Sequence, residues 1–177
     1  APIQRAIMNG DKKIGLSIMK INEKLDSGPV LFTKELKLEQ DTTHGEMEEI
    51  LSIHGAKLLI ESLKNIISGN SKFVEQSYFE ATYAKKIKKE ETKINWNFEA
   101  KKVLAHIHGL SPNPGAWFEF ENERFKILKA KISQMTGKAG SVIDDKLTIA
   151  CKEKSVQVLE LQRQGKKNQT VKTAIIS

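Results

Sequence analysis

The spacing of apolar residues changes near residue 82, and this change constrains the fold more than any other feature of the sequence. Before it lie two stretches of strand character, residues 14–21 and 30–38, and then a long run with helical spacing. After it, apolar residues fall into short alternating stretches separated by turn residues. With 177 residues, 39% of them hydrophobic, the chain can bury a core. We therefore expect the later part of an α/β domain, followed by a small β-barrel or sandwich.

Local signals mark the ends of the helices in the first part. Thr43 is followed three residues later by Glu46, a capping-box spacing, and helical spacing then continues through Ile66. Ser-Gly-Asn at residues 68–70 should end this helix. A shorter helix is expected to begin at Pro2 and to end before the Asn-Gly-Asp turn that follows it.

A lysine-rich stretch, residues 82–96, connects the two parts. It has no sustained apolar face, so we expect an exposed connection. Asn97 can cap a following helix, which the Gly-Leu-Ser-Pro-Asn-Pro-Gly segment at residues 109–115 should break. Five short strands should then follow. They are residues 116–121, 124–133, 141–145, 146–151 and 155–162.

Charge is divided unevenly between the two parts. Residues 1–80 carry 10 Lys and Arg against 12 Asp and Glu, whereas residues 81–177 carry 19 against 10. The second part, with a net charge of +9, has the excess expected of a protein that meets polyanions. Lysine-rich surfaces are also common in ordinary soluble proteins, so charge alone leaves nucleic-acid binding and simple solvation both open.

Other chemical signals are few. His44, His54, His106 and His108 show no metal-ligand spacing, so we interpret them as core or surface histidines and expect no metal. The sequence contains no phosphate-binding glycine loop and no nucleophile elbow. The residues alone therefore indicate a two-part protein with a basic β module.

The tryptophans and the single cysteine have simple structural interpretations. Trp96 and Trp117 could stack on nucleotide bases, but alternation around Trp117 favours a partly buried strand. Cys151 cannot form an internal disulfide and lies in an alternating stretch, which favours a small strand residue in a reducing compartment. There is neither a membrane-spanning apolar run nor a signal-peptide pattern. We expect a soluble, cytoplasmic protein.

The segment Ile-Asn-Glu-Lys-Leu-Asp-Ser-Gly-Pro-Val-Leu-Phe, residues 21–32, places Asp26 between the two expected strands. Asp, Ser, Gly and Pro all suit turn geometry, and Gly28 can adopt a positive φ. A turn alone explains Asp26 on this local pattern.

The same segment and several others resemble the methionyl-tRNA formyltransferase family. The start, Ala-Pro-Ile-Gln-Arg-Ala-Ile, is similar to the end of that family's Arg-Gly-Ala-Ala-Pro-Ile segment. Leu-Asp-Ser-Gly-Pro-Val-Leu at residues 25–31 matches the Leu-Asp-x-Gly segment shared by folate-dependent formyltransferases. Residues 93–96 (Lys-Ile-Asn-Trp), 111–120 (Ser-Pro-Asn-Pro-Gly-Ala-Trp-Phe-Glu-Phe) and 159–167 (Leu-Glu-Leu-Gln-Arg-Gln-Gly-Lys-Lys) resemble its C-terminal domain. The motifs are short, and they are specific only together.

This resemblance implies a domain organisation. Residues 1–80 would be the C-terminal part of a Rossmann-like, folate-dependent formyltransferase domain, incomplete in this chain. Residues 81–97 would be a basic linker, and residues 98–177 an oligonucleotide-binding (OB)-like barrel that binds tRNA. Because the family's catalytic asparagine and histidine lie upstream, we expect a fragment that is inactive alone. Its first part would leave parallel-sheet edges exposed, and its final Thr-Ala-Ile-Ile-Ser would stop inside a last helix.

The resemblance also implies a reaction and its residues. The family transfers a formyl group from 10-formyltetrahydrofolate, without a metal, to the amine of methionyl-initiator-tRNA for translation initiation in protein biosynthesis. Asp26 falls on the family's catalytic aspartate, and Ser27, Gly28 and Pro29 would shape the loop around the folate. A monomer is expected. The tRNA-binding candidates are Lys85, Lys86, Lys88, Lys89, Lys166 and Lys167.

Two other functions stay open. A stand-alone basic RNA-binding module without catalysis would fit if the chain were a complete gene product. Another folate-dependent formyltransferase, acting on a small amine, would fit residues 25–31 alone, although the basic second part argues against it.

Overall fold

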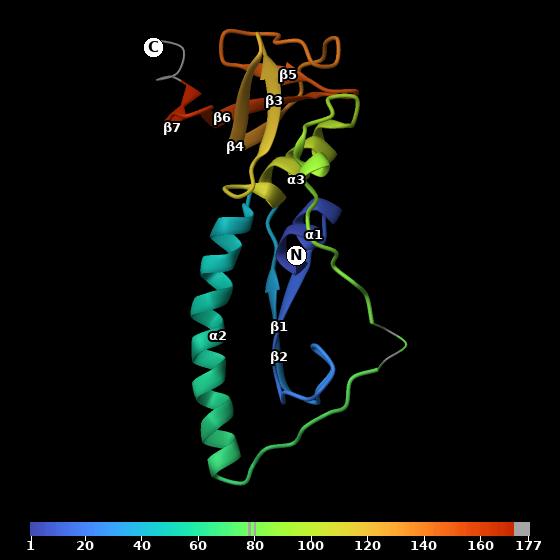
Figure 1. Ribbon diagram of the computed structural model, residues 1–177, viewed down its shortest axis with the longest axis vertical. Helices are drawn as coiled ribbons and strands as arrows, with labels where there is room; N and C mark the ends of the chain where they lie inside the picture. The colour runs from blue at the N-terminus through green and yellow to red at the C-terminus, as the bar shows by residue number, and fades with distance from the viewer. Residues whose placement is uncertain (78, 80, 172–177) are drawn as a thin grey trace.

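The computed structural model describes residues 1–77, 79 and 81–171, and the expected last helix lies outside them. A hairpin and the long helix α2 occupy one end of the molecule, and an antiparallel sheet occupies the other (Figure 1). The shorter helices α1 and α3 lie between them. In chain order the elements are α1 (Pro2–Asn9), β1 (Lys13–Met19), β2 (Val30–Lys37), α2 (His44–Ile67), the 3-10 helix η2 (Lys89–Thr92), α3 (Ala100–Leu110), β3 (Ala116–Phe120), β4 (Glu123–Ser133), β5 (Thr148–Ala150), β6 (Ser155–Arg163) and β7 (Asn168–Thr170).

In the first part, β1 and β2 form an antiparallel hairpin. Their register pairs Lys13 with Lys37 and Ser17 with Thr33, and Leu31 forms a bulge near the loop. The segment between the strands is long enough to reverse the chain but too short for the crossover that parallel neighbours need. The two expected strands are therefore confirmed, and they pair antiparallel, so the expectation of a parallel sheet is wrong for this pair.

Both helices of the first part begin and end at their predicted signals. The Thr43 hydroxyl accepts a hydrogen bond from the Glu46 N–H (3.3 Å), and the Glu46 carboxylate accepts one from the Thr43 N–H (2.7 Å). Pro2 lies in the first turn of α1, and Gly10 caps its end with a φ of 76°. A small buried cluster packs these helices against the end of the hairpin. It consists of Ile7, Leu38, Met47 and Leu51.

The second part is a curled antiparallel sheet. The strand order is β3-β4-β6-β5, and β7 also pairs with β6. Shifts of register between Ile127 and Ala130 bend β4. The sheet packs on α3, and Ile107, Ile127 and Val156 are among the fully buried residues between them. The predicted small barrel is thus a half-barrel that carries α3 on its inner side.

Four of the five expected strands are present, although the one at 146–151 is shorter than expected. Residues 141–145 do not form a strand, because only Val142 makes an isolated bridge. The Asp144 carboxylate instead accepts hydrogen bonds from the N–H groups of Lys146 and Thr148, which closes a turn. The strand that completes the sheet is β7, which the sequence did not indicate.

The connection between the parts is exposed at its lysines but buried at its end. Thr92 and Ile94 are buried, and the Ile94 N–H donates to the Trp117 carbonyl on β3 at 2.8 Å. The expected exposure therefore holds only for the first part of the connection. The prediction that Asn97 caps α3 is wrong: the cap position is Glu99, two residues later, and its side chain makes no capping hydrogen bond.

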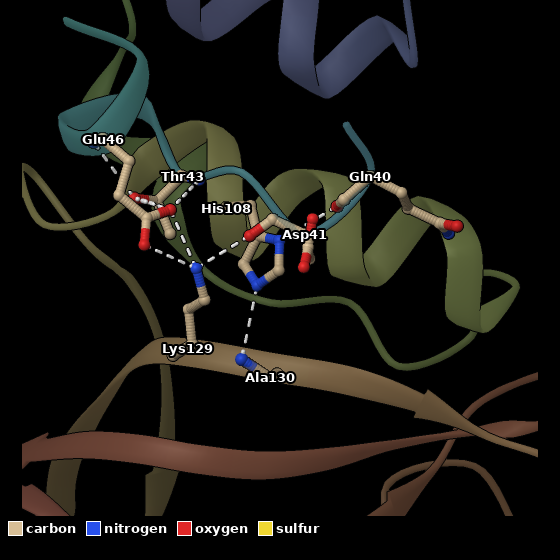
Figure 2. Close-up of polar contacts among 7 residues, drawn as sticks. All are labelled: Gln40, Asp41, Thr43, Glu46, His108, Lys129 and Ala130. Carbon is tan, nitrogen blue, oxygen red and sulfur yellow. Dashed lines mark hydrogen bonds and ion pairs between the residues drawn. The ribbon is translucent and has the colours of Figure 1, made fainter. Parts of the chain in front are cut away.

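The two parts contact each other through helices and a polar cluster. A Cβ atom at Gly109 of α3 would lie 2.5 Å from Cγ of Met8, so only glycine permits this approach to α1. On the other side of α3, Lys129 of β4 donates to the Glu46 carboxylate at 2.7 Å and to the Asp41 carbonyl at 2.8 Å (Figure 2). Both contacts join residues of the first part to the second.

His108 lies at the centre of this cluster and is fully buried (Figure 2). The Ala130 N–H donates to its Nε2 at 3.3 Å, and its Nδ1 lies 3.2 Å from the Gln40 carbonyl. Because Nε2 accepts a hydrogen bond, the neutral ring carries its proton on Nδ1 and donates it to Gln40. The interpretation of His108 as a core histidine is confirmed.

We expect the free energy of unfolding to fall as the pH is lowered from 7.5 to 5. Burial lowers the pKa of His108 and of His106 below the usual value of 6.5. Below about pH 6.5 the unfolded chain therefore binds more protons than the folded chain, which favours unfolding; above it the difference vanishes. Urea denaturation of the wild type and of His108→Gln across this range measures the effect.

His108→Gln should lower the free energy of unfolding by about 1–3 kcal/mol at pH 7.5, because a buried backbone group loses its partner. The free energy of unfolding of this variant should also depend less on pH than that of the wild type. If the free energy of unfolding had the same pH dependence in both proteins, His108 would not be a cause of that dependence.

Candidate functional site

Asp26 lies in the loop between β1 and β2, where it is exposed. Its φ of 53° is in the left-handed region, which Asp and Asn tolerate better than most residues. Within the described part of the chain, its backbone carbonyl has a hydrogen-bond partner but its carboxylate has none. The turn is therefore real, and it presents an unpaired carboxylate to solvent.

Gln76 and Gly28 hold this loop in shape. Nε2 of Gln76 donates to the carbonyls of Asp26 at 3.0 Å and of Gly28 at 2.6 Å, from the segment that follows α2 and pairs with β2. A Cβ atom at Gly28 would lie 1.8 Å from the carbonyl oxygen of Lys20, so only glycine fits. Nothing in the sequence around Gln76 indicated this role, because its partners are distant in the sequence.

Ser27 and Pro29 contribute to the loop from within. The Ser27 hydroxyl lies 3.0 Å from Oδ1 of Asn22 and 3.1 Å from the carbonyl oxygen of Lys24. The Pro29 carbonyl accepts a hydrogen bond from the Lys20 N–H at 2.9 Å. Both residues thus shape the loop, and their contact with a folate stays a prediction.

Four of the expected tRNA-binding residues lie in the connection and are exposed; these connection lysines are Lys85, Lys86, Lys88 and Lys89. Their backbone is anchored to α1. Arg5 donates to the carbonyls of Lys85 (3.0 Å) and Lys86 (3.1 Å), and it forms a bidentate ion pair with Glu91 at 2.7 and 2.9 Å. Hydrogen bonding from Arg5 lowers the pKa of Glu91 to about 2. Arg5 and Glu91 were not predicted from the sequence.

The other two candidates, Lys166 and Lys167, lie in the exposed turn between β6 and β7. Gly165 adopts a φ of 71° in this turn, and Nε2 of Gln162 donates to the Lys166 carbonyl at 3.0 Å. No hydrogen bond or ion pair joins this turn to the connection lysines in the described part of the chain. The six predicted lysines therefore form two separate groups.

The histidines, Cys151 and the helices offer no further candidate site in the part of the chain that the structure describes. Among the described residues, no group of His, Cys, Asp and Glu could hold a metal ion. None of the helices described is long and apolar enough to cross a membrane. Burial raises the pKa of Cys151 to about 11, which fits an unreactive core residue. A cavity of about 320 Å³, whose lining includes Met8, Gln40 and Lys102, contains neither Asp26 nor a predicted lysine.

Each part of the chain matches the sequence pattern of a known protein family. The sequence pattern described as formyl transferase, C-terminal domain, matches residues 86–176, and the pattern described as formyl transferase matches residues 1–63. The first match alone covers just over half of the chain. The chain belongs to the formyl transferase family.

Within the formyl transferase family, similar curated proteins carry the name methionyl-tRNA formyltransferase. The protein of that name from Pelagibacter ubique (strain HTCC1062) is 44% identical over 177 residues, which cover 99% of this chain and 57% of that protein. The one from Chelativorans sp. (strain BNC1) is 43% identical over 171 residues, which cover 94% and 55%. The chain spans about half the length of the curated relatives it matches.

Several solved structures share the fold. HypX from Aquifex aeolicus in complex with tetrahydrofolic acid matches with a TM-score of 0.77 and 18% identity, over 98% of this chain and 32% of that one. Methionyl-tRNA formyltransferase from Clostridium thermocellum matches with a TM-score of 0.60 and 24% identity, over 75% and 57%. The expected order, the later part of an α/β formyltransferase domain and then a small OB-like β-barrel, is thereby confirmed, with the barrel present as the curled half-barrel described above.

Proposed function

We propose that this chain acts as the C-terminal portion of a methionyl-tRNA formyltransferase. The full-length enzyme transfers a formyl group from 10-formyltetrahydrofolate to the amine of methionyl-initiator-tRNA for translation initiation. The observation that carries this proposal is the loop at residues 25–28, which presents the Asp26 carboxylate without a partner among the described residues. The chain that carries this loop is 44% identical to a methionyl-tRNA formyltransferase.

The reaction is an acyl transfer. The α-amine of methionine attacks the formyl carbon, and a new C–N bond forms as the bond from that carbon to N10 of the folate breaks. Negative charge builds on the formyl oxygen, where donors held in place stabilise it, and the amine must lose a proton. The asparagine and histidine that the family resemblance implies for the oxygen are not among the residues of this chain. Asp26 would orient that histidine, favour its charged form, or hold a water that accepts the proton.

The loop would form one wall of the folate site. The Ser27 hydroxyl is already engaged inside the loop, so residues 27–29 suit a shaping role better than a donor role. HypX, which shares the fold, was solved with tetrahydrofolic acid, and this supports a folate as the formyl donor. The proposed mechanism requires no metal.

The second part would supply most of the tRNA binding. We assign residues 1–80 to the catalytic domain, 81–97 to a basic linker and 98–177 to the tRNA-binding domain. The net charge of +9 beyond residue 80 and the exposed connection lysines support this division. The enzyme would act as a monomer in the cytoplasm, where translation begins.

A formylation assay with the full-length enzyme and with the isolated chain tests the proposed function. With 10-formyltetrahydrofolate as donor, the full-length enzyme should formylate methionyl-initiator-tRNA, and the isolated chain should show no turnover because the oxyanion donors are absent. Turnover by the isolated chain near that of the full-length enzyme would contradict the assignment. Formylation of a small amine in place of the tRNA would favour another formyltransferase activity.

Replacing all four connection lysines by Ala should weaken tRNA binding and flatten its dependence on salt. Phosphate contacts release counterions, so log K falls against log[salt] by roughly 0.7–0.9 per phosphate neutralised. Such contacts position RNA without reading bases, and initiator and elongator tRNA should therefore lose affinity alike. Filter binding of both tRNAs over a salt series measures this. An unchanged slope would show that these lysines are solvated surface, and a loss confined to initiator tRNA would show that they discriminate.

A further inference from the structure

The strand registers place one row of side chains across the sheet of the second part. Residues that are paired directly on neighbouring strands have their side chains on the same face. The row begins in the connection, crosses β3, β4 and β6, and ends on β7. This cross-strand row consists of Lys93, Trp117, Lys126, Gln162 and Asn168.

The row lies on the face of the sheet that points away from the core. Side chains alternate between faces along a strand. On each of β3, β4 and β6 one neighbour of the row is buried in the core: Ala116, Ile127 and Leu161. The members of the row are exposed or half-buried. The row is therefore accessible to a ligand.

Trp117 holds two cations on this face. The guanidinium of Arg124 lies 3.8 Å from the centre of its ring, and Nζ of Lys93 lies 5.2 Å from it. The indole is itself held, because its Nε1–H donates to Oγ1 of Thr92 at 2.9 Å. Trp117 thus makes cation–π contacts with two side chains, and its ring is not free to stack on a base.

The face carries more positive than negative charge. Lys93, Arg124 and Lys126 form no ion pair with any residue that the structure describes. The aliphatic part of Lys126 packs over Gly115, where a Cβ atom would lie 2.7 Å from its Cδ. Glu119, the cross-strand partner of Arg124, and the exposed Glu160, two residues before Gln162 on β6, add two negative charges. Three cations with ordered side chains remain available to an anionic ligand.

The row also joins the two groups of predicted lysines. At one end, the Thr92 hydroxyl that holds Trp117 donates to the Lys89 carbonyl at 2.7 Å. At the other end, Gln162 donates to the Lys166 carbonyl at 3.0 Å. Four inter-strand steps of about 4.8 Å give a length of about 19 Å, enough for several phosphates of a nucleic-acid strand.

We propose that the cross-strand row, together with Arg124, is a phosphate-binding surface on which the tRNA backbone runs from the connection lysines to Lys166 and Lys167. The inference rests on the proposed function, and it adds residues that were not candidates from the sequence. Charge complementarity identifies the ligand as a polyanion, and the covered indole excludes base stacking as the mode of binding. Arg124 and Lys126 should carry most of the contact, since the Arg124 guanidinium packs on Trp117, Lys126 packs over Gly115, and neither forms an ion pair with a described residue.

The test compares two double variants of the 177-residue chain. Arg124→Ala with Lys126→Ala removes two positive charges from the row. Lys138→Ala with Lys152→Ala removes the same charge from exposed positions outside it. The row variant should bind initiator tRNA about tenfold more weakly at 0.1 M salt, and the slope of log K against log[salt] should become shallower by about 1.4 to 1.8. The control variant should keep the slope of the wild type.

The outcomes separate this inference from the proposed function. Failure of the wild-type chain to bind tRNA would reject the tRNA-binding role as a whole. Loss of affinity in the connection-lysine variant, with the row variant equal to its control, would reject the row alone. Equal losses in row and control variants would also reject it, because net charge would then explain both. Arg124→Lys with Lys126→Arg keeps the charge and should retain most of the affinity, which excludes misfolding as the cause.

Discussion

Asp26→Asn, made in the full-length enzyme, should lower kcat by on the order of 100-fold or more while the protein stays folded. The carboxylate is exposed and has no partner among the described residues, so the fold does not depend on its charge. Asn has the same shape and tolerates the left-handed backbone that Asp26 adopts at a φ of 53°. The substitution therefore removes the proton-handling group and little else.

Steady-state kinetics with methionyl-initiator-tRNA and 10-formyltetrahydrofolate measure this loss, and Asp145→Asn is the matched control. Asp145 is exposed in the second part and loses the same charge far from the loop, so its kcat should equal that of the wild type. If Asp26→Asn kept kcat within about twofold of the wild type, Asp26 would be a turn residue only.

Gly28→Ala should reduce kcat by about 100-fold through the shape of the same loop. The added Cβ would lie 1.8 Å from the carbonyl oxygen of Lys20, and because this oxygen belongs to the backbone, the loop must move. The move would disturb the hydrogen bonds from Gln76 to Asp26 and Gly28, which hold the carboxylate in position. Displacing a catalytic group by about 1 Å can cost about 100-fold in rate.

Gly15→Ala is the control for this effect. Gly15 lies in β1 of the same hairpin, and a Cβ atom there would meet nothing within 4 Å, so kcat should change little. Circular dichroism and the thermal midpoint of each variant separate a local change in the loop from unfolding. Normal kcat in a folded Gly28→Ala variant would show that the loop conformation does not matter for catalysis.

The sequence correctly predicted the structural features that depend on short-range interactions. Thr43 and Glu46 cap α2 as predicted, because a capping box joins residues only three apart. Alternation located most strands of the second part, since the two faces of a strand differ in their contact with the core. Where a side chain competed locally with the strand, as Asp144 does, the prediction failed.

The candidate site was predicted in part. The family resemblance led to Asp26, and the structure adds that its carboxylate has no partner among the described residues and that Gly28 admits no side chain. The lysines were identified by charge, but their division into two groups depends on where α1, β6 and β7 lie. Arg124 and Lys126 were missed, because isolated basic residues in an alternating strand look like ordinary solvated surface.

By itself, the sequence determined most of the elements, the basic character of the second part and the family. The tertiary structure decided how the elements meet: the antiparallel hairpin, the contact of Gln76 with a loop about 50 residues away, and the row that crosses the sheet from Lys93 to Asn168. These features depend on pairing and packing between residues far apart in the chain. The free energy of such contacts includes the closing of long loops and the burial of shared surface, which no local pattern contains.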